Sequence, residues 1–300
     1  MPFPEPVQYV DRQTGTIETE RVLGRGFLSR LYHTAPGRLT LRVLLARRAS
    51  SVPYGWLNSL PATAWQLRRF AKALGIDTRE AEKPLTAYRS INELFARRLR
   101  PGARPFDADP AILASPAEGR VLAYDSLAGD TVVPAKGANW SLGDLLGGTT
   151  DARRWHGGAA LVVRLAPIDY HRFHFPDDGV AARSYRVLGA LHSVSPIALA
   201  SGLPIFPRNQ RDVCLFASRG FGTIAIVEIG ALGVGTIRQT YVPGSSVSRG
   251  DEKGYFLLGG STVVLLLQPG VARLDGDLVA STSRGLETFV RCGTHVASRA

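Results

Sequence analysis

Three short segments of the sequence carry side chains that can do chemistry, and the first is built around a serine. Ser261 follows Gly259 and Gly260 and begins an apolar run that ends at Leu267. A serine hydroxyl is a strong nucleophile only when a base removes its proton. Taken alone, the two glycines are explained as an ordinary turn or bulge before a buried strand. The segment therefore needs partners elsewhere before it indicates a reaction.

The candidate partners are two histidines and a carboxylate. His171 and His174 lie in the segment DYHRFHFP, and Glu118 lies in the Pro/Gly-rich turn SPAEG. Two histidines at this spacing can ligate a metal, but no third His or Cys follows at a useful distance and prolines limit a helix here, so we do not favour a zinc site. The G-x-S-x-G elbow of many hydrolases is absent around Ser261, which disfavours an ordinary acyl hydrolase.

The strand that Ser261 begins belongs to a β-rich region. From residue 109 onward, short β-branched runs alternate with turns. The runs are RVLAY, TVVPA, ALVVRLA, DVCLFAS, GTIAIVEIG and STVVLLL. This pattern predicts an antiparallel sandwich or barrel that carries the catalytic residues. One short helix is expected within the segment NWSLGDLLGG, where Ser141 and Asp144 form a capping signal.

The first third of the chain predicts helices at residues 36–48, 62–75 and 90–100. The second of these has its apolar side chains on one face and ends at a glycine, which favours a helix end there. The third begins with Ser90 and Glu93, which have the spacing of a capping box. The apolar face of the second helix consists of Leu67, Phe70, Ala71 and Leu74. A Pro/Gly-rich segment then separates this region from the strands, so we expect an α+β chain with regions 1–108 and 109–300.

The net charge of +11 is concentrated in the first third, where residues 1–100 hold 17 Lys and Arg against 8 Asp and Glu. Such a charge attracts anionic lipid or nucleic acid. Basic amphipathic helices beside aromatic residues such as Trp56 and Trp65 favour an anionic membrane surface over a nucleic acid. The equal alternative is that the apolar stripes only pack against the body of the protein.

The composition is typical of a globular protein, with 45% hydrophobic and 20% charged residues in 300. No apolar run reaches the roughly 18 residues that a membrane-spanning helix needs. The first residues lack the basic and apolar regions of a signal peptide. Cys214 and Cys292 have no metal or redox spacing. These features favour a cytoplasmic protein without disulfides.

Taken together, the three segments resemble the phosphatidylserine decarboxylases, a family of self-processing pyruvoyl enzymes. The resemblance covers nearly the whole chain, and the signatures DYHRFH and GST in this order are specific. It is carried by YVDRQTG, YGW, GIDTREAEKPLTAYRSINELFARRLRPGARPFD, SPAEG, AKGANWSLGDLLGG, PIDYHRFHFPDDG, LHSVSPIAL, NQRDVCLF, GALGVGTI, RGDEKGYF and LGGSTVVLL.

The resemblance implies that the chain cuts itself between Gly260 and Ser261. The serine hydroxyl would attack the glycine carbonyl, and elimination would leave a covalent pyruvoyl group derived from Ser261. The products would be a β chain of residues 1–260 and an α chain of residues 261–300, which stay together as a heterodimer that can pair further. The two glycines allow the close backbone approach that this reaction needs.

The resemblance also implies roles for the other candidate residues. His174 is the expected base for Ser261, and Glu118 is expected to orient the His174 ring. The family usually has Asp where this chain has Glu118, so the carboxylate is one methylene farther from the backbone. His171 is the expected proton donor in decarboxylation.

The implied reaction is the conversion of phosphatidylserine to phosphatidylethanolamine and CO2, through a Schiff base between the substrate amine and the pyruvoyl group. The basic helices would then rest on the anionic lipid of the cytoplasmic face of the cell membrane. Three alternatives remain at this point. They are a pyruvoyl enzyme for another amine, an unprocessed membrane-binding pseudoenzyme, and a nucleic-acid-binding protein, which we do not favour.

Overall fold

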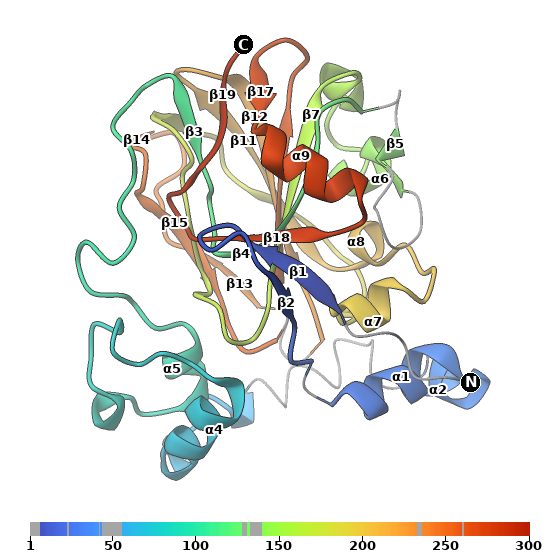
Figure 1. The fold of residues 1–300 in the computed structure, drawn as a ribbon, viewed down its shortest axis with the longest axis vertical. Helices are drawn as coiled ribbons and strands as arrows, with labels where there is room; N and C mark the ends of the chain where they lie inside the picture. Colours follow the sequence, from blue (N-terminus) through green and yellow to red (C-terminus); the bar gives the residue numbers. More distant parts are fainter. Residues whose placement is uncertain are drawn as a thin grey trace.

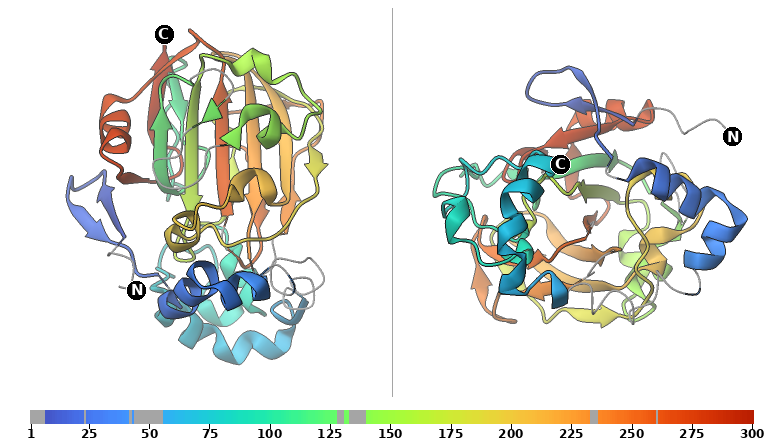
Figure 2. Two further views of the ribbon diagram at one scale, coloured as in Figure 1. Left: turned by 90° about the vertical axis from the view of Figure 1, so that its right-hand side faces the viewer. Right: turned by 90° about the horizontal axis from the view of Figure 1, so that it is seen from below.

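Helices gather at one end of a large β-rich body in the computed structural model of this chain (Figure 1). These helices are α1 (Arg25–His33), α2 (Ala35–Thr40), α4 (Leu67–Leu74) and α5 (Ile91–Phe95). Figure 2 shows the same helices beneath the strands in its side view. The structure describes residues 7–22, 24–41, 43, 56–127, 131–132, 140–232, 236–259 and 261–300.

The largest sheet in the described residues has 11 strands and is antiparallel except where β1 pairs with β18. Strand β10 (Tyr185–Val187) pairs with β11 beside the main path. The main path runs in the order β14 (Ser246–Val247), β9 (Gly179–Ala181), β11 (Arg211–Ser218), β12 (Gly222–Gly230), β16 (Ser261–Leu267), β7 (Ala159–Leu165), β4 (Gly119–Tyr124), β18 (Glu287–Val290), β1 (Gln8–Asp11) and β2 (Ile17–Thr19).

Strand β16 lies in the middle of this sheet, between β12 and β7, and all its residues are buried. Alternate side chains of a strand point to opposite faces. Val263 and Leu265 therefore join one apolar cluster, while Val264 and Leu266 join the cluster on the opposite face. A strand that is apolar on both faces requires a covering layer on each side of the sheet.

One face of the sheet is covered by smaller sheets and a helix, and the other is covered mainly by helices. The first cover comprises the sheet of β13 (Ile237–Gln239), β15 (Glu252–Phe256) and β8 (Arg172–His174), the sheet of β17 (Ala272–Leu274), β19 (His295–Arg299) and β3 (Ile112–Ala114), and α9 (Gly276–Ser283). The second comprises α1, α6 (Leu142–Leu146), η4 (Ala152–Trp155), α7 (Pro196–Leu199), α8 (Ile205–Arg208) and Trp140 of the pair β5 (Thr131–Val132) and β6 (Trp140–Ser141). The predicted α+β fold with an antiparallel β-rich domain is confirmed.

The predicted helix at 62–75 consists of a 3-10 segment, η2 (Pro61–Gln66), followed by α4. It ends at Gly75, whose φ of 74° is a left-handed conformation that favours glycine. Leu67 and Ala71 are buried in a small apolar cluster that includes Ile76, Tyr88 and Leu94. The apolar stripe of α4 is therefore packed against its neighbours, as one of the two interpretations of the sequence expected.

The predicted helix at 90–100 is shorter in the structure. Helix α5 begins after Ser90, whose side chain accepts a hydrogen bond from the Glu93 backbone N–H, as the capping signal predicted. It ends at Phe95, since Ala96 leaves the helical conformation. Leu99 then forms an isolated β-bridge with Ala81, and the 3-10 segment η3 (Leu85–Ala87) follows Ala81 in the chain. The predicted helix at 36–48 is seen as α2, and most of its remainder lies outside the described residues.

The first region also contributes strands that the sequence did not predict. Strand β1 pairs with β18 near the end of the chain, so the N-terminal segment extends the main sheet. The guanidinium of Arg120 stacks over Tyr9 and Phe289, at 4.8 and 5.2 Å from their ring centroids. The predicted short helix is α6, and the Ser141 side chain accepts from the Asp144 N–H. No helix within the described ranges is long and apolar enough to cross a membrane.

Candidate active site

Ser261 is the first residue of β16 and is fully buried. Its backbone pairs with Gly230 of β12 and with Leu165 of β7, so it is held from both sides. Gly259 has a φ of 142°, a conformation that residues with a side chain rarely adopt. Gly260, the expected cleavage-site residue, lies outside the described residues. A serine hydroxyl thus begins a strand that is paired on both sides, two residues after a glycine with an unusual backbone conformation.

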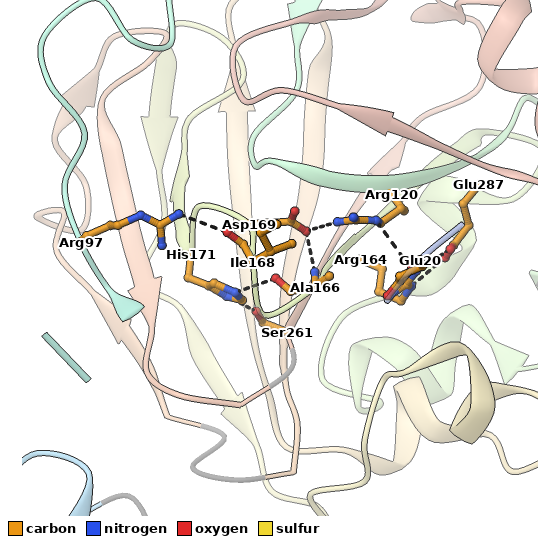
Figure 3. Close-up of polar contacts among 10 residues, drawn as sticks. All are labelled: Glu20, Arg97, Arg120, Arg164, Ala166, Ile168, Asp169, His171, Ser261 and Glu287. Carbon is orange, nitrogen blue, oxygen red and sulfur yellow. Dashed lines mark hydrogen bonds and ion pairs between the residues drawn. The ribbon is translucent and has the colours of Figure 1, made fainter. Parts of the chain in front are cut away.

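His171 holds the hydroxyl of Ser261 (Figure 3). The Ser261 Oγ and His171 Nδ1 atoms are 2.9 Å apart, and His171 Nε2 lies 3.0 Å from the Ala166 carbonyl oxygen. A carbonyl oxygen only accepts, so Nε2 carries the proton and the Nδ1 lone pair accepts the hydrogen bond from the serine hydroxyl. This is the arrangement of a nucleophile and its base.

The surroundings of His171 keep its imidazole neutral. Burial, together with the nearby positive charge of Arg97, lowers its pKa to about 3. The ring stacks on Phe95 of α5, with the ring centroids 3.8 Å apart. Helix α5 also anchors the segment before the serine, because the Asn92 side-chain oxygen accepts from the Leu258 N–H at 2.9 Å. The first region of the chain therefore completes the site on the β-rich body.

A buried carboxylate positions the loop that orients His171. Asp169 accepts a hydrogen bond from the Ala166 N–H at 2.6 Å and forms an ion pair with Arg120. Burial raises the pKa of Asp169 to about 6, against the opposing effect of Arg120. Since Ala166 also accepts from His171, a line of contacts runs from Arg120 to Ser261. Sequence reasoning did not identify Asp169, although it lies two residues before His171 in the specific signature.

Arg120 and Asp169 belong to a larger buried group of charges, which we call the ion cluster and which comprises Glu20, Arg120, Arg164, Asp169 and Glu287. Arg164 donates to both carboxylate oxygens of Glu20 and of Glu287, at 2.5 to 3.1 Å. Arg120 lies 3.6 Å from the same Glu20 carboxylate. The cluster joins four separate parts of the sequence, and each of its charges has an oppositely charged neighbour.

His174, the expected base, has other partners in the structure. Its Nδ1 lies 2.9 Å from the Gly250 carbonyl oxygen, and its Nε2 lies 3.1 Å from the Tyr170 hydroxyl. Burial lowers the pKa of His174. His171, and not His174, is therefore the histidine that is hydrogen-bonded to the Ser261 hydroxyl. The physical reason is the extended backbone here, where residues an odd number apart point to opposite sides.

Glu118, expected to orient His174, forms an ion pair with Arg104 instead. Arg104 Nε donates to the Glu118 carboxylate at 2.5 Å, and Arg104 Nη2 donates to Glu80 at 2.8 Å. The Glu118 segment does lie beside His174, because the His174 backbone N–H donates to the Pro116 carbonyl at 2.8 Å. Both ring nitrogens of His174 are occupied, however, so neither is left for the carboxylate.

Neither histidine has a nitrogen free for a metal, because each ring nitrogen of His171 and His174 is engaged by a hydrogen bond. Within the part of the chain that the structure describes, no group of three or more His, Cys, Asp or Glu side chains could hold a metal ion. Cys214 and Cys292 are both free thiols and buried.

Comparison with known proteins adds a family relationship. Residues 91–297 match the family described as phosphatidylserine decarboxylase. The chain is 37% identical to the phosphatidylserine decarboxylase proenzyme of Ruminiclostridium cellulolyticum, over 97% of both chains. It is 38% identical to the protein of that name from Fusobacterium nucleatum, over 96% of both chains, and 40% identical to the one from Chlamydia trachomatis serovar L2b, over 95% of both chains.

Proposed function

Because this chain belongs to the phosphatidylserine decarboxylase family, we propose that it converts phosphatidylserine to phosphatidylethanolamine and CO2 after cutting itself between Gly260 and Ser261. The observation that carries the proposal is the hydrogen bond between Ser261 Oγ and His171 Nδ1, at the start of a fully buried central strand. The relatives are named as proenzymes, which supports a chain that is made as a precursor.

The cut needs only the residues of the chain. Ser261 Oγ attacks the carbonyl carbon of Gly260 while the hydroxyl proton passes to His171 Nδ1. The peptide C–N bond breaks, the proton moves to the leaving nitrogen, and an ester now joins the two parts. Loss of the Cα proton of residue 261 breaks the Cβ–Oγ bond, which frees the upstream chain with a carboxylate at Gly260 and leaves dehydroalanine. Water then displaces its nitrogen as ammonia, and a pyruvoyl group remains.

The surroundings of Ser261 fit such a group. The position is fully buried at the end of a strand that is hydrogen-bonded on both sides, and His171 lies against it. Once formed, a pyruvoyl group supplies a carbonyl that accepts the electron pair left when a bound amine substrate loses CO2. His171 Nδ1 faces residue 261. Because decarboxylation replaces CO2 with a proton, this atom would first take up a proton from solvent, and it is the atom of this chain that we assign to return that proton to the substrate carbon.

The helical end of the molecule supports a membrane-bound substrate. Trp65 and Trp56 are 77% and 64% exposed, and Phe27 and Leu39 on the neighbouring helices are also exposed. These helices lie at the same end of the β-rich body in both side views (Figures 1 and 2). Exposed aromatic side chains within a basic region favour an anionic lipid surface. We therefore propose a peripheral enzyme on the cytoplasmic face of the cell membrane.

Intact mass spectrometry of the purified protein tests the cut. We expect two chains of residues 1–260 and 261–300, the smaller with a blocked, carbonyl-reactive N-terminus, and CO2 release from phosphatidylserine but not from free serine. Ser261→Ala should remain one chain of 32.3 kDa without activity. Thr262→Val is the matched control, because it removes the neighbouring buried hydroxyl. This variant should cut normally. A folded parent that stays uncut, with an ordinary serine at 261, would contradict the proposal.

A further inference from the structure

One buried cation beside the active site has no counter-ion in contact. Arg97 is 5% exposed and lies two residues after Phe95, whose ring stacks on His171. Its Nη2 donates to the Ile168 carbonyl at 3.2 Å, while its Nε and Nη1 have no hydrogen-bond partner. Figure 3 shows the guanidinium pointing toward the segment of Ile168 and His171. Its charge reaches the catalytic ring, since it helps to lower the pKa of His171.

A guanidinium in this state calls for a ligand. Burying a charge without hydrogen bonds is costly, and buried charges in proteins are normally paired. The nearby acids do not provide the pair, because Glu118 is bound to Arg104 and Asp169 is bound to Arg120. A guanidinium binds planar or tetrahedral oxyanions through several donors at once. Arg97 thus has both the charge and the unused donors of an anion-binding residue.

We propose that Arg97 binds the phosphodiester of the phospholipid headgroup and so holds the substrate amine at residue 261. This inference rests on the proposed function. The substrate has a second anion, its carboxylate, but the carboxylate loses its charge as CO2 leaves. A cation that stabilises the carboxylate favours the ground state over the transition state and slows the reaction. The phosphodiester keeps its charge throughout, so binding it positions the substrate without opposing the chemistry.

The test compares Arg97→Gln and Arg97→Lys with Arg98→Gln. Arg98 is the matched control, because it is the adjacent arginine but its side chain is 61% exposed. After the cut fraction is measured by mass spectrometry, KM and kcat are measured with short-chain phosphatidylserine. We expect Arg97→Gln to raise KM about tenfold or more with a smaller change in kcat, as the loss of a charged hydrogen-bonding pair implies. Arg97→Lys should recover part of the loss, and Arg98→Gln should match the parent.

Product inhibition separates the phosphodiester from the carboxylate. Short-chain phosphatidylethanolamine keeps the phosphodiester and the amine but lacks the carboxylate. We expect its inhibition constant to rise in Arg97→Gln by the same factor as KM. A rise in KM without a rise in this inhibition constant would show that Arg97 binds the carboxylate instead. No change in either constant would show that Arg97 does not bind the substrate. Displacement of the lipid by inorganic phosphate at similar concentrations would assign the site to a free anion.

A binding measurement covers variants that fail to cut. Short-chain phosphatidylethanolamine is titrated calorimetrically into Ser261→Ala and into the double variant Ser261→Ala/Arg97→Gln, neither of which needs processing. Binding that weakens about tenfold in the double variant supports the site, and equal binding overturns it. Failure of the proposed function is seen separately, as a parent protein that stays uncut or releases no CO2 from phosphatidylserine.

Discussion

Two groups of buried charges flank His171, and they differ in how their charges are balanced. In the ion cluster, Arg164 is bound by two carboxylates and Arg120 lies against Asp169. On the other side, Arg97 has one carbonyl contact and two unpaired nitrogens. Buried charges that are fully paired hold segments of the chain together, whereas an unpaired one costs stability that a ligand can recover. The first group therefore serves the fold, and the second serves binding.

The largest expected effect is the difference in unfolding free energy between removing Arg164 from the ion cluster and removing Arg97. In the uncut Ser261→Ala protein, Arg164→Met leaves the Glu287 carboxylate without a cation and Glu20 with Arg120 alone, so we expect a loss of about 3–5 kcal/mol in unfolding free energy. Arg97→Met removes a buried cation that costs stability and loses one hydrogen bond to a carbonyl, so we expect no loss of unfolding free energy and a gain of about 1 kcal/mol or more. Chemical denaturation measures both. Equal losses would show that Arg97 is as structural as Arg164.

The second largest effect concerns the two histidines. His171→Ala removes the acceptor of the Ser261 hydroxyl hydrogen bond, which we propose as the base, so we expect self-cleavage to slow at least about 100-fold. His174→Ala removes contacts to Gly250 and Tyr170 and should slow it much less. The fraction of cut chain is followed over time by denaturing gel. If self-cleavage were slowed more in His174→Ala than in His171→Ala, His174 and not His171 would be the base.

A pH effect follows from the buried state of His171. Its pKa is about 3 in the folded protein against 6.5 ordinarily, so the unfolded chain binds a proton first as the pH falls. The neutral folded form is thus favoured above pH 6.5 and loses stability between 6.5 and 3. We compare Ser261→Ala with Ser261→Ala/His171→Asn. The unfolding free energy of the protein with His171, minus that of the protein with Asn, should be about 2 kcal/mol lower at pH 5 than at pH 8. A difference that stays constant with pH would mean that His171 is not desolvated.

The smallest effect is expected at Glu118. Glu118→Asp shortens the side chain by one methylene, and the long side chain of Arg104 can follow it. Self-cleavage should be at least as fast as in the parent, with a change under about threefold. The same time course measures it. A complete block would show that the length of this carboxylate is specific to this site.

Local signals in the sequence predicted much of the fold. Five of the six predicted runs lie in β4, β7, β11, β12 and β16, where most residues are buried. The sixth, TVVPA, begins with β5, and the rest of it lies outside the described residues. Ser90 and Ser141 cap their helices through the predicted side-chain contacts. Such caps depend on residues three apart, which a sequence displays directly. Strand β1 was not predicted, because its partner β18 lies almost the whole chain away.

The sequence named candidate residues for the site but did not predict the contacts that they make. Ser261, His171, His174 and Glu118 are identified by type and motif, yet the choice between two histidines depends on how an extended segment is rotated. Arg97 is one of several arginines in its segment, and only the packing of α5 shows that it is the buried one. Information of this kind is tertiary and has no short-range signal.

The central position of β16 has a consequence for the life of the protein. An uncut chain that unfolds can refold alone, because all strands belong to one molecule. After the proposed cut, the segment 261–300 supplies β16 in the middle of the sheet, together with β17, β18 and β19. Refolding would then require two separate molecules to meet, which depends on concentration. Maturation would thus make unfolding effectively irreversible, and the working lifetime of the enzyme would be set by the rate of its first unfolding.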